Sequence, residues 1–568
     1  MKPRASSAVT SGTQALRYQV VLIILAVLLG FLVLRLLNLQ VLQGEKDYRY
    51  LQQAGDARSV RTVVNTAHRG MITDRHGRPL AISTPVQSIW LNPQQFRLSN
   101  AAILAEQLGM SAAHLTAKVE RNKSKEFLYV KRQLAPQRAE KVLDLKIPGV
   151  HSETEYKRFY PAAEVSAHLL GFTDVDQKGV DGLEWTYDSL LRGQSGSKRV
   201  LKSLDGKVIK NIDSVVDVSH GDDLQLSIDL RLQYYAYKEL KAAVEKFGAR
   251  SGSVVILDTQ TNEILAMVNE PSYNPNKRAG LTNDHIRNRA ITDVFEPGST
   301  MKPLTMIGAL ESDYYHQDSQ IDTSPGYINI EGKLIADIKN YGSLDINGIL
   351  KKSSQVGTSL VALQLGGSTI REVMQRFGLG QSLATGFPGE SFGSLPNYAK
   401  WHPLHTVTMA YGYGVATTPL QLAQVYSVLA NRGLRKDVSL IRSSDEAYSE
   451  RVVDETIARQ VAGMLTHTTE QGGTGTRAQI DGYSVAGKTG TLHRLGKKGY
   501  EGSNYVSVFA GFAPANAPRL AAAVVIDDPR AGSYYGGEVA APVFSRVVGE
   551  SLRLLNVLPD EIQIAEVM

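Results

Sequence analysis

The sequence predicts a multidomain α+β protein that carries a single N-terminal transmembrane helix. Three observations lead to this prediction. The chain has 568 residues, and residues 20–34 form an uninterrupted run of apolar or small side chains. At about 100–200 residues per domain, this length is sufficient for several domains. Strand patterns occur at both ends of the C-terminal region with helical patterns between them, which is typical of an α/β domain whose termini share one sheet.

The composition excludes several classes of protein. The chain has no cysteine, which excludes a disulfide scaffold, a thiolate zinc site, an iron–sulfur cluster and a cysteine nucleophile. Its 62 Lys and Arg residues nearly balance 56 Asp and Glu residues, and the two signs are interspersed, which disfavours a nucleic-acid binder. A hydrophobic content of 43% excludes wholesale disorder.

We interpret the apolar run as an uncleaved membrane anchor over residues 18–41. With its flanks it reaches the ~20 residues that cross ~30 Å of hydrocarbon. Residues 1–17 form the predicted cytoplasmic tail, because Lys2, Arg4 and Arg17 have no acidic neighbour there and positive segments stay inside. No small-residue cleavage site follows the run, which disfavours a signal peptide. A buried core helix is the other alternative, although such helices are seldom apolar on every face.

Residues 42–221 are predicted to form a separate α+β domain. Residues 68–81 have the pattern of a strand, a turn and a second strand, with Arg-His-Gly-Arg-Pro at the turn. Amphipathic helices are predicted over residues 101–108 and 136–145, the second with its proline in the tolerated first turn. Residues 193–202 form a Gly/Ser/basic stretch, and residues 220–223 (His-Gly-Asp-Asp) are predicted to be a linker.

Residues 222–557 are predicted to form the α/β domain, and residues 558–568 a C-terminal tail. A helical period covers residues 230–247. The remaining predicted elements are a hairpin of residues 253–258 and 263–268, strands over 505–513 and 520–526, and a final helix over 542–555.

The first chemical motif is Ser299-x-x-Lys302. Pro297 and Gly298 break the preceding element, and Pro303 is tolerated only in the first turn of a helix, so a helix is predicted to begin at or beside Ser299. Positions three apart share one helix face. A serine nucleophile needs an adjacent base, and a lysine with a lowered pKa can be that base. Backbone N–H groups at the helix start help to stabilise developing negative charge.

The S-x-x-K pattern alone is weak evidence. A second literal match, Ser195-x-x-Lys198, falls in the Gly/Ser stretch, a predicted loop in which nothing positions the pair. We interpret this second match as solvated linker.

The second motif is Lys488-Thr489-Gly490-Thr491. On a strand edge this group suits a substrate carboxylate, because Lys488 supplies charge, the two threonines supply hydroxyls and Gly490 allows close approach of the backbone. The alternative is a surface turn.

These motifs resemble those of a known family. S-x-x-K followed by S-x-N and K-T-G is the signature of penicilloyl serine transferases, and the surrounding phrases resemble the class B penicillin-binding proteins, most of all the division-type (septal) transpeptidases. The resemblance implies a cytoplasmic tail, one anchor, an elongated α+β pedestal of the class B dimerisation type, and a transpeptidase domain similar to the serine β-lactamases. The resembling phrases include residues 69–75, 158–161, 168–172, 182–184, 288–291, 411–414 and 534–537.

The middle motif departs from the family pattern. The matching phrase is Ser353-Ser354-Gln355, in which Gln355 stands where the family has asparagine. Glutamine keeps the donor and acceptor of the amide but is one methylene longer. A displaced amide can weaken substrate positioning, since ~1 Å errors cost about 100-fold in rate. A literal S-x-N at Ser272-Tyr273-Asn274 precedes the nucleophile in a Pro-rich loop, and we reject it.

The resemblance also implies a role for each motif residue. Ser299 would be the nucleophile, Lys302 its base and Ser353 the proton relay to the leaving group. Gln355 would contact the peptide amide of the substrate. Lys488, Thr489 and Thr491, with Gly490 between them, would hold the substrate carboxylate, and the backbone N–H groups of Ser299 and Thr491 would form the oxyanion hole.

Four tyrosines, Tyr411, Tyr413, Tyr534 and Tyr535, resemble residues that line the family's cleft. Aromatic core packing is an equal alternative for each of them. His493 follows the third motif, and we interpret it as a histidine of a solvated loop rather than of the cleft.

The implied function is a membrane-anchored peptidoglycan D,D-transpeptidase that cross-links stem peptides ending in D-Ala-D-Ala during septal synthesis and is acylated by β-lactams. It would lie in the bacterial cytoplasmic membrane with its catalytic domain in the periplasm, and a membrane-embedded glycosyltransferase of the division machinery would contact its anchor and pedestal. No metal or organic cofactor is expected. The alternatives are a D,D-carboxypeptidase-like hydrolase, or a catalytically weak specialised paralogue or β-lactam-binding scaffold, for which Gln355 is the hint.

Overall fold

The structure is a computed structural model that describes residues 11–40, 60–202, 208–442, 448–496 and 499–560. The first ten residues of the predicted cytoplasmic tail and the last eight of the predicted C-terminal tail lie outside these ranges. The chain divides into two compact units. The first comprises residues 1–67 and 194–220, and the second comprises residues 68–193 and 221–568.

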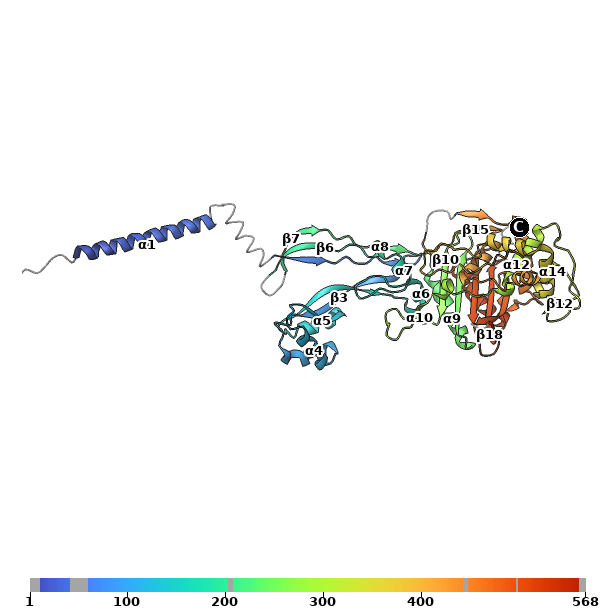
Figure 1. Cartoon of the computed structure of the whole chain (residues 1–568), viewed down its shortest axis with the longest axis horizontal. Coiled ribbons are helices and arrows are strands. Elements are labelled where there is room, and N and C mark those ends of the chain that lie inside the picture. The colour runs from blue at the N-terminus through green and yellow to red at the C-terminus, as the bar shows by residue number, and fades with distance from the viewer. Residues whose placement is uncertain (1–10, 41–59, 203–207, 443–447, 497–498, 561–568) are drawn as a thin grey trace, which may run out of the picture. The chain divides into compact units, whose positions relative to one another are not determined.

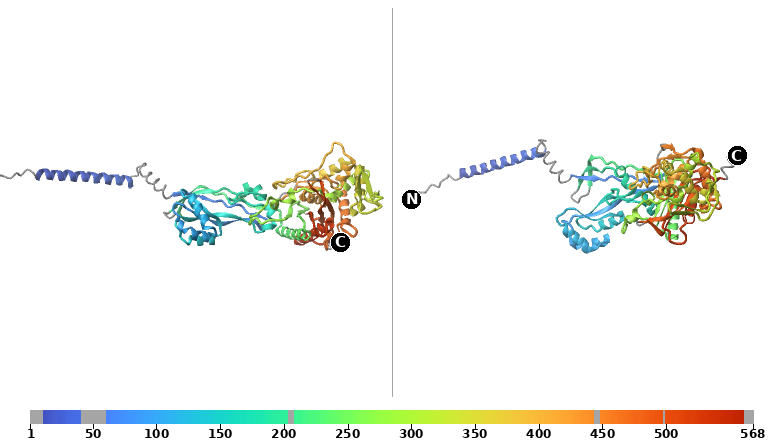
Figure 2. Two further views of the ribbon diagram at one scale, coloured as in Figure 1. Left: turned by 60° about the horizontal axis from the view of Figure 1, so that its bottom comes forward. Right: turned by 45° about the vertical axis from the view of Figure 1, so that its right-hand side comes forward.

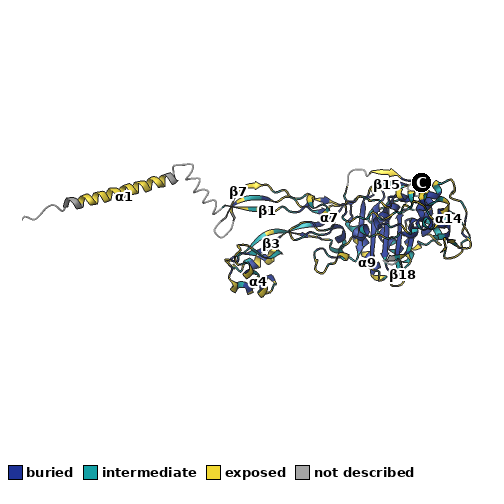
Figure 3. Ribbon diagram, in the orientation of Figure 1, coloured by how far each residue is buried: buried dark blue, intermediate teal, exposed yellow. Residues whose placement is uncertain are grey.

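The first unit contains the apolar helix and a small sheet. Helix α1 (Ser11–Gln40) includes Ala15–Leu37, which is long and apolar enough to cross a membrane. The side chains of residues 15–37 are exposed (Figure 3), as expected of a helix that faces lipid. The antiparallel sheet has the order β1-β6-β7, formed by β1 (Val60–Asn65), β6 (Gly196–Lys202) and β7 (Val208–Val216).

The interpretation of residues 195–198 as solvated linker is wrong, because most of them belong to a paired strand. Strand β6 pairs on one side with β1 and on the other with β7, so its backbone groups are hydrogen-bonded despite a Gly/Ser/basic composition. Val200 is fully buried. Ser195 accepts a hydrogen bond from the Ala67 N–H (3.1 Å), so the second S-x-x-K match lies at the start of a strand and not in a solvated loop.

The second unit begins with an α+β region built around strand β3 (Pro79–Leu91). This strand pairs with β2 (Ile72–Thr73), β4 (Leu128–Leu134) and β5 (Val150–Phe159). Both predicted helices form, since α3 spans Ala101–Leu108 and α5 spans Pro136–Leu143. The other elements here are η1 (Leu98–Asn100), α4 (Ala112–Arg121), η2 (Ala163–Val165), α6 (Ala167–Leu170), α7 (Gly182–Thr186), α8 (Asp188–Leu191) and β8 (Leu224–Gln225).

A buried cluster of ion pairs holds this region together. Glu184 is fully buried and accepts charge-assisted bonds from Arg69 Nε and Arg158 Nε, both at 2.6 Å. Arg69 Nη1 also pairs with Asp188 (2.6 Å). Arg75 pairs with Glu263 (3.2 Å), which joins the N-terminal strands to the hairpin of the C-terminal region.

The C-terminal region is built on a five-stranded antiparallel sheet with the order β10-β9-β19-β18-β17. The early strand β9 pairs with the late strand β19, so the predicted sheet that joins both ends of the region is confirmed. Figures 1 and 2 show the green early strands beside the red late ones. The strands are β9 (Ser251–Asp258), β10 (Ile264–Glu270), β17 (Ala486–Gly496), β18 (Gly499–Ala513) and β19 (Leu520–Asp527).

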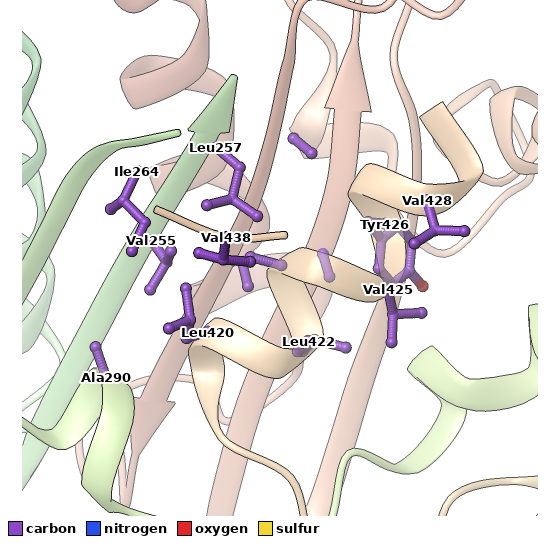
Figure 4. Packing of buried hydrophobic residues seen from close by; sticks show 14 of the residues in the cluster. Val255, Leu257, Ile264, Ala290, Leu420, Leu422, Val425, Tyr426, Val428 and Val438 are labelled. Atoms are coloured by element: carbon purple, nitrogen blue, oxygen red, sulfur yellow. The ribbon is translucent and has the colours of Figure 1, made fainter. Parts of the chain in front are cut away.

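The sheet is apolar on both faces because alternate residues point to opposite sides. Val254 and Ile256 pack with α9 (Leu230–Lys246) and α20 (Ala541–Leu554), close to the helices predicted over 230–247 and 542–555. Val255 and Leu257 pack instead with α17 (Pro419–Ala430), as the labelled side chains of Figure 4 show.

The remaining elements lie between β10 and β17 in the chain, or between β19 and α20. They are α10 (Asn283–Ile286), α11 (Arg289–Thr292), η3 (Gly298–Met301), α12 (Lys302–Glu311), β11 (Ile321–Asp322), β12 (Tyr327–Ile330), β13 (Lys333–Ala336), β14 (Ser343–Leu344), α13 (Ile346–Lys352), α14 (Gln355–Leu365), α15 (Gly367–Arg376), α16 (Pro403–Ala410), β15 (Leu434–Lys436), β16 (Ser449–Arg451), α18 (Glu455–Thr469), η4 (Thr476–Ala478) and α19 (Gly536–Val539).

Candidate active site

Ser299 lies in the short 3₁₀ turn η3, directly before α12. The preceding Gly298 has φ +57°, and a Cβ on it would lie 2.4 Å from Leu492 Cδ2, so only glycine fits. The Gly298 N–H donates to the Gly412 carbonyl (3.1 Å), and the buried Tyr426 hydroxyl donates to the Thr300 carbonyl (2.9 Å). These contacts fix Ser299 at the start of the helix, as predicted.

Lys302 is fully buried at the first position of α12. Its Nζ donates to the Ser353 carbonyl (2.6 Å), the Ser353 hydroxyl (3.2 Å) and the Ser354 carbonyl (3.2 Å). Ser299 Oγ is not among these acceptors, so the structure brings Lys302 to Ser353 by direct contact and to Ser299 by helical spacing alone.

The surroundings of Lys302 disfavour its charged form. Burial lowers the pKa of Lys302 well below its ordinary value, and the charge of Lys488 acts in the same direction. The charge of Asp337 opposes this shift. A buried amine that makes no direct ion pair within the described residues is suited to lose its proton and act as a base. When neutral, it donates to at most two of the three oxygens that its Nζ contacts.

Ser353 lies at a strained turn between α13 and α14. Its φ is +55°, in the left-handed region that non-glycine residues seldom adopt. The turn is held by Asp337, which accepts hydrogen bonds from the Ser354 hydroxyl (2.5 Å) and from the backbone N–H groups of Gln355 and Val356. Sequence reasoning missed Asp337, because it belongs to no motif and reaches the turn only through the fold of the β12–β13 hairpin.

The third motif occupies the edge strand β17, beside the turn that carries Ser299. Lys488 is fully buried, and its Nζ contacts Thr489 O (3.3 Å) and Thr474 Oγ1 (3.5 Å). Burial lowers the pKa of Lys488 to about 7. A Cβ on Gly490 would lie 3.0 Å from the Pro297 carbonyl, so glycine lets the strand pack closely against η3.

The two threonines of this motif are held by their own partners. The hydroxyls of Thr489 and Thr474 are 2.8 Å apart, and Thr491 Oγ1 accepts the Gly536 N–H (2.9 Å). The predicted surface-turn alternative for the motif is wrong, since the motif lies in a paired strand. Thr474 is a second residue that no sequence signal indicated.

A cavity of about 480 Å³ is lined by Gln355, Tyr411, Tyr413 and His493 together with residues of β13. Tyr411 is buried and makes an edge contact with Tyr413 (5.7 Å between ring centroids). Gln355 is half-buried at the first position of α14. The structure thus places Gln355, which stands where the family has asparagine, on the same cavity as Tyr411 and Tyr413.

The other two tyrosines belong to a stack of rings on the sheet. Tyr534 stacks on Tyr505, with 4.0 Å between ring centroids, and on Tyr535, with 4.5 Å between ring centroids. His493 packs against Tyr505 (4.6 Å). The prediction that His493 lies in a solvated loop is wrong, because β17 continues beyond the motif and pairs His493 with Tyr505.

These features together define a class of enzyme. A serine at a helix start, a neutralised buried lysine one turn away and a threonine-rich strand edge are the components of serine acyl transfer. Among the described residues, no group of three or more histidine, aspartate or glutamate side chains is arranged to hold a metal ion.

Comparison with known proteins identifies the family. Residues 252–549 match the penicillin binding protein transpeptidase domain, and residues 64–226 match the penicillin-binding protein dimerisation domain. The chain therefore belongs to the class B penicillin-binding proteins, of the FtsI type. The predicted family and fold class are confirmed, whereas the domain boundaries and the residue roles stay predictions.

Individual relatives resemble almost the whole chain. The probable peptidoglycan D,D-transpeptidase PbpC of Pseudomonas aeruginosa is 42% identical over 97% of this chain and 98% of its own length. The peptidoglycan D,D-transpeptidase FtsI of Escherichia coli K12 is 42% identical over 94% of this chain and 90% of its own. The crystal structure of penicillin-binding protein 3 from Mycobacterium tuberculosis, complexed with aztreonam, superposes with a TM-score of 0.69 at 26% identity, covering 88% of this chain and 98% of that one.

Proposed function

We propose that this chain is a peptidoglycan D,D-transpeptidase that forms septal cross-links through an acyl-enzyme on Ser299. The enzyme class follows from the family. The single observation that supports the residue assignment is the fully buried Lys302 Nζ, which lies 3.2 Å from the Ser353 hydroxyl and one helical turn from Ser299.

In the proposed acylation step, neutral Lys302 accepts the proton of Ser299 as its oxygen attacks the carbonyl carbon of the penultimate D-Ala. The backbone N–H groups of Ser299 and Thr491 stabilise the developing oxyanion. Ser353 passes the proton from Lys302 to the departing amine, the C–N bond breaks and the terminal D-Ala leaves. The 3.2 Å contact between Lys302 and Ser353 is the first link of this relay.

The acyl-enzyme is then resolved by the amino group of a second stem peptide. The amine attacks the ester carbonyl, its proton returns through the same groups to the Ser299 oxygen, and an amide cross-link forms. A β-lactam follows the acylation step by opening its ring, and its acyl-enzyme is released slowly.

The strand β17 supplies the site for the substrate carboxylate. Burial lowers the pKa of Lys488 to about 7, so near pH 7 small changes in its surroundings shift its protonation. An arriving carboxylate would favour the charged form. The hydroxyls of Thr489 and Thr491 would donate to the same carboxylate. Lys488 is therefore only partly charged in the empty site near pH 7, and it would gain charge when a substrate carboxylate binds.

The membrane arrangement is part of the proposal. The exposed apolar helix would anchor the chain in the cytoplasmic membrane with its basic N-terminus inside and the catalytic domain in the periplasm. The chain's polymerising partner would be a membrane-embedded glycosyltransferase of the division machinery that contacts the anchor and the pedestal. A reporter fused to either end of the chain, active only in the periplasm, tests the orientation.

Intact mass after treatment with benzylpenicillin tests the nucleophile. The full chain should gain the mass of one benzylpenicillin, and the Ser299→Ala variant should gain none. Paired stem peptides then distinguish cross-linking from release of D-Ala, because a carboxypeptidase-like enzyme would give release alone. Absence of an adduct on the folded wild-type chain would favour the scaffold alternative instead.

A further inference from the structure

A second cavity, of about 360 Å³, lies at one end of the catalytic sheet, against the segment that leads to Ser299. It falls in the size range of small-molecule pockets. Much of its wall is apolar, with Phe295, Leu492, Val506 and Val525 among the lining residues. The proposed mechanism uses none of the residues that line it.

The buried guanidinium of Arg289 also lines this cavity. Its side chain is only 7% exposed, and its Nη2 pairs with Asp284 at 2.9 Å. Its Nε lies 4.0 Å from Asp293. Within the described part of the chain, Nη1 has no hydrogen-bond partner. A buried charged donor without an acceptor is costly, so this nitrogen calls for an acceptor that the protein does not supply.

The Nη1 donor of Arg289, which has no partner among the described residues, favours an anion over a cation, although charges of both signs surround it. Burial lowers the pKa of Arg289. The charges of Asp284 and Asp293 raise it, and those of Arg287 and Arg250 lower it. Asp293, the acid closest to its Nε, already pairs with Arg287 at 2.9 Å.

The other acids on the wall are also engaged. Asp527 pairs with Arg250 and lies 3.7 Å from Arg494 Nε, and Glu296 accepts the Gly414 N–H at 2.7 Å. They still carry negative charge toward the cavity, so a doubly charged ligand would be repelled. Arg289 Nη1, a donor beside an apolar wall and without a partner in the described ranges, suits a ligand that has one negative charge and an otherwise apolar structure.

We propose that this cavity binds a small molecule with one carboxylate and a compact apolar body. The carboxylate accepts from Arg289 Nη1, and the apolar body packs against Phe295, Leu492 and Val525. The ligand would thereby bridge the segment before Ser299 and the strand that continues from Thr491. No covalent step is involved.

The test uses the full chain in zwitterionic lipid nanodiscs with cyclohexanecarboxylate as the probe and cyclohexanecarboxamide, its uncharged counterpart, as the matched control. Binding is measured by saturation-transfer NMR and by calorimetry, with empty nanodiscs as the blank. We expect the carboxylate to bind about 10- to 100-fold more tightly than the carboxamide, because only the carboxylate makes a charge-assisted bond.

Two variants locate the binding. Arg289→Gln removes the charge, and Val294→Trp fills the rim of the cavity at a residue that is 48% exposed. Both should lose the preference for the carboxylate while Ser299 is still acylated by labelled penicillin, which also checks folding. If Arg289→Gln does not fold, Val294→Trp decides alone. Equal affinity for the two probes, no binding of the carboxylate, or undiminished binding in Val294→Trp would overturn the proposal.

Discussion

The second compact unit buries basic side chains in two places, and their partners differ between the two. In the N-terminal part, Arg69 and Arg158 both pair with the fully buried Glu184. In the catalytic part, the equally buried Lys302 and Lys488 contact carbonyl and hydroxyl oxygens. A carboxylate partner keeps a buried cation charged and makes it a structural cross-link, whereas neutral partners let it lose its proton and become a base.

The largest effect is expected from a substitution of Lys302 in the catalytic part. Lys302→Met removes the base but keeps an apolar chain of similar length, so acylation by labelled benzylpenicillin should fall by about 10²–10⁴-fold. The thermal midpoint should stay the same or rise, because an apolar side chain replaces a buried amine that has no counter-ion. The rate of adduct formation and the melting curve of the same sample measure both.

The second S-x-x-K pair supplies the matched control for that variant. Lys198→Met changes the same residue type in strand β6 and should leave acylation unchanged. An acylation rate in Lys302→Met within a few-fold of wild type would show that another group is the base.

Glu184→Gln tests the buried ion pairs of the N-terminal part. This change leaves two buried guanidinium groups without their shared carboxylate, and we expect a loss of about 3–5 kcal/mol in the free energy of unfolding. The acylation rate per folded molecule should be preserved, because Glu184 makes no contact with the catalytic residues. Thermal melting at a fixed scan rate and acylation below the melting range provide the measurement.

An exposed ion pair is the control for Glu184. Glu455 pairs with Arg459 at 2.5 Å, and both side chains are about half-exposed. Glu455→Gln should therefore change stability by less than about 1 kcal/mol. Equal destabilisation by the two variants would mean that burial does not distinguish these pairs.

The two halves should also differ in their response to pH. The pKa of Lys488 is about 7 in the folded chain against an ordinary 10.5, so between these values the unfolded chain binds a proton that the folded chain does not. Lys488 therefore makes stability rise with pH in this window, by at most about 1.4 kcal/mol per pH unit, and contributes no slope below it.

The measurement is the difference in stability between wild type and Lys488→Met from pH 7 to 10. The free energy of unfolding of the wild type minus that of Lys488→Met should rise with pH over this range. Below pH 7 the difference should stay constant. Glu184→Gln introduces no group that titrates between pH 7 and 10, so it should give a difference that does not depend on pH. A flat profile for Lys488→Met would show that this lysine is charged in the folded chain.

Much of this comparison could be predicted from the sequence, but not all of it. Ser299, Lys302 and Lys488 could be predicted as candidate catalytic residues because each lies in a short local motif, and their roles stay predictions. Asp337 escaped prediction because it reaches α14 from a hairpin. Strand β6 escaped because its pairing partners lie far from it in the chain, so its local composition indicates a linker.

The smallest expected effect concerns Gln355. Its backbone N–H is held by the carboxylate of Asp337, while its side chain belongs to the cavity beside Tyr411 and Tyr413. Because the backbone is fixed, the extra methylene must be absorbed by the amide head. Gln355→Asn should therefore move the amide by about 1 Å without disturbing the turn, and we expect the acylation rate to change measurably but by no more than about 100-fold. A rate equal to wild type would show that the longer side chain already places its amide where the substrate needs it.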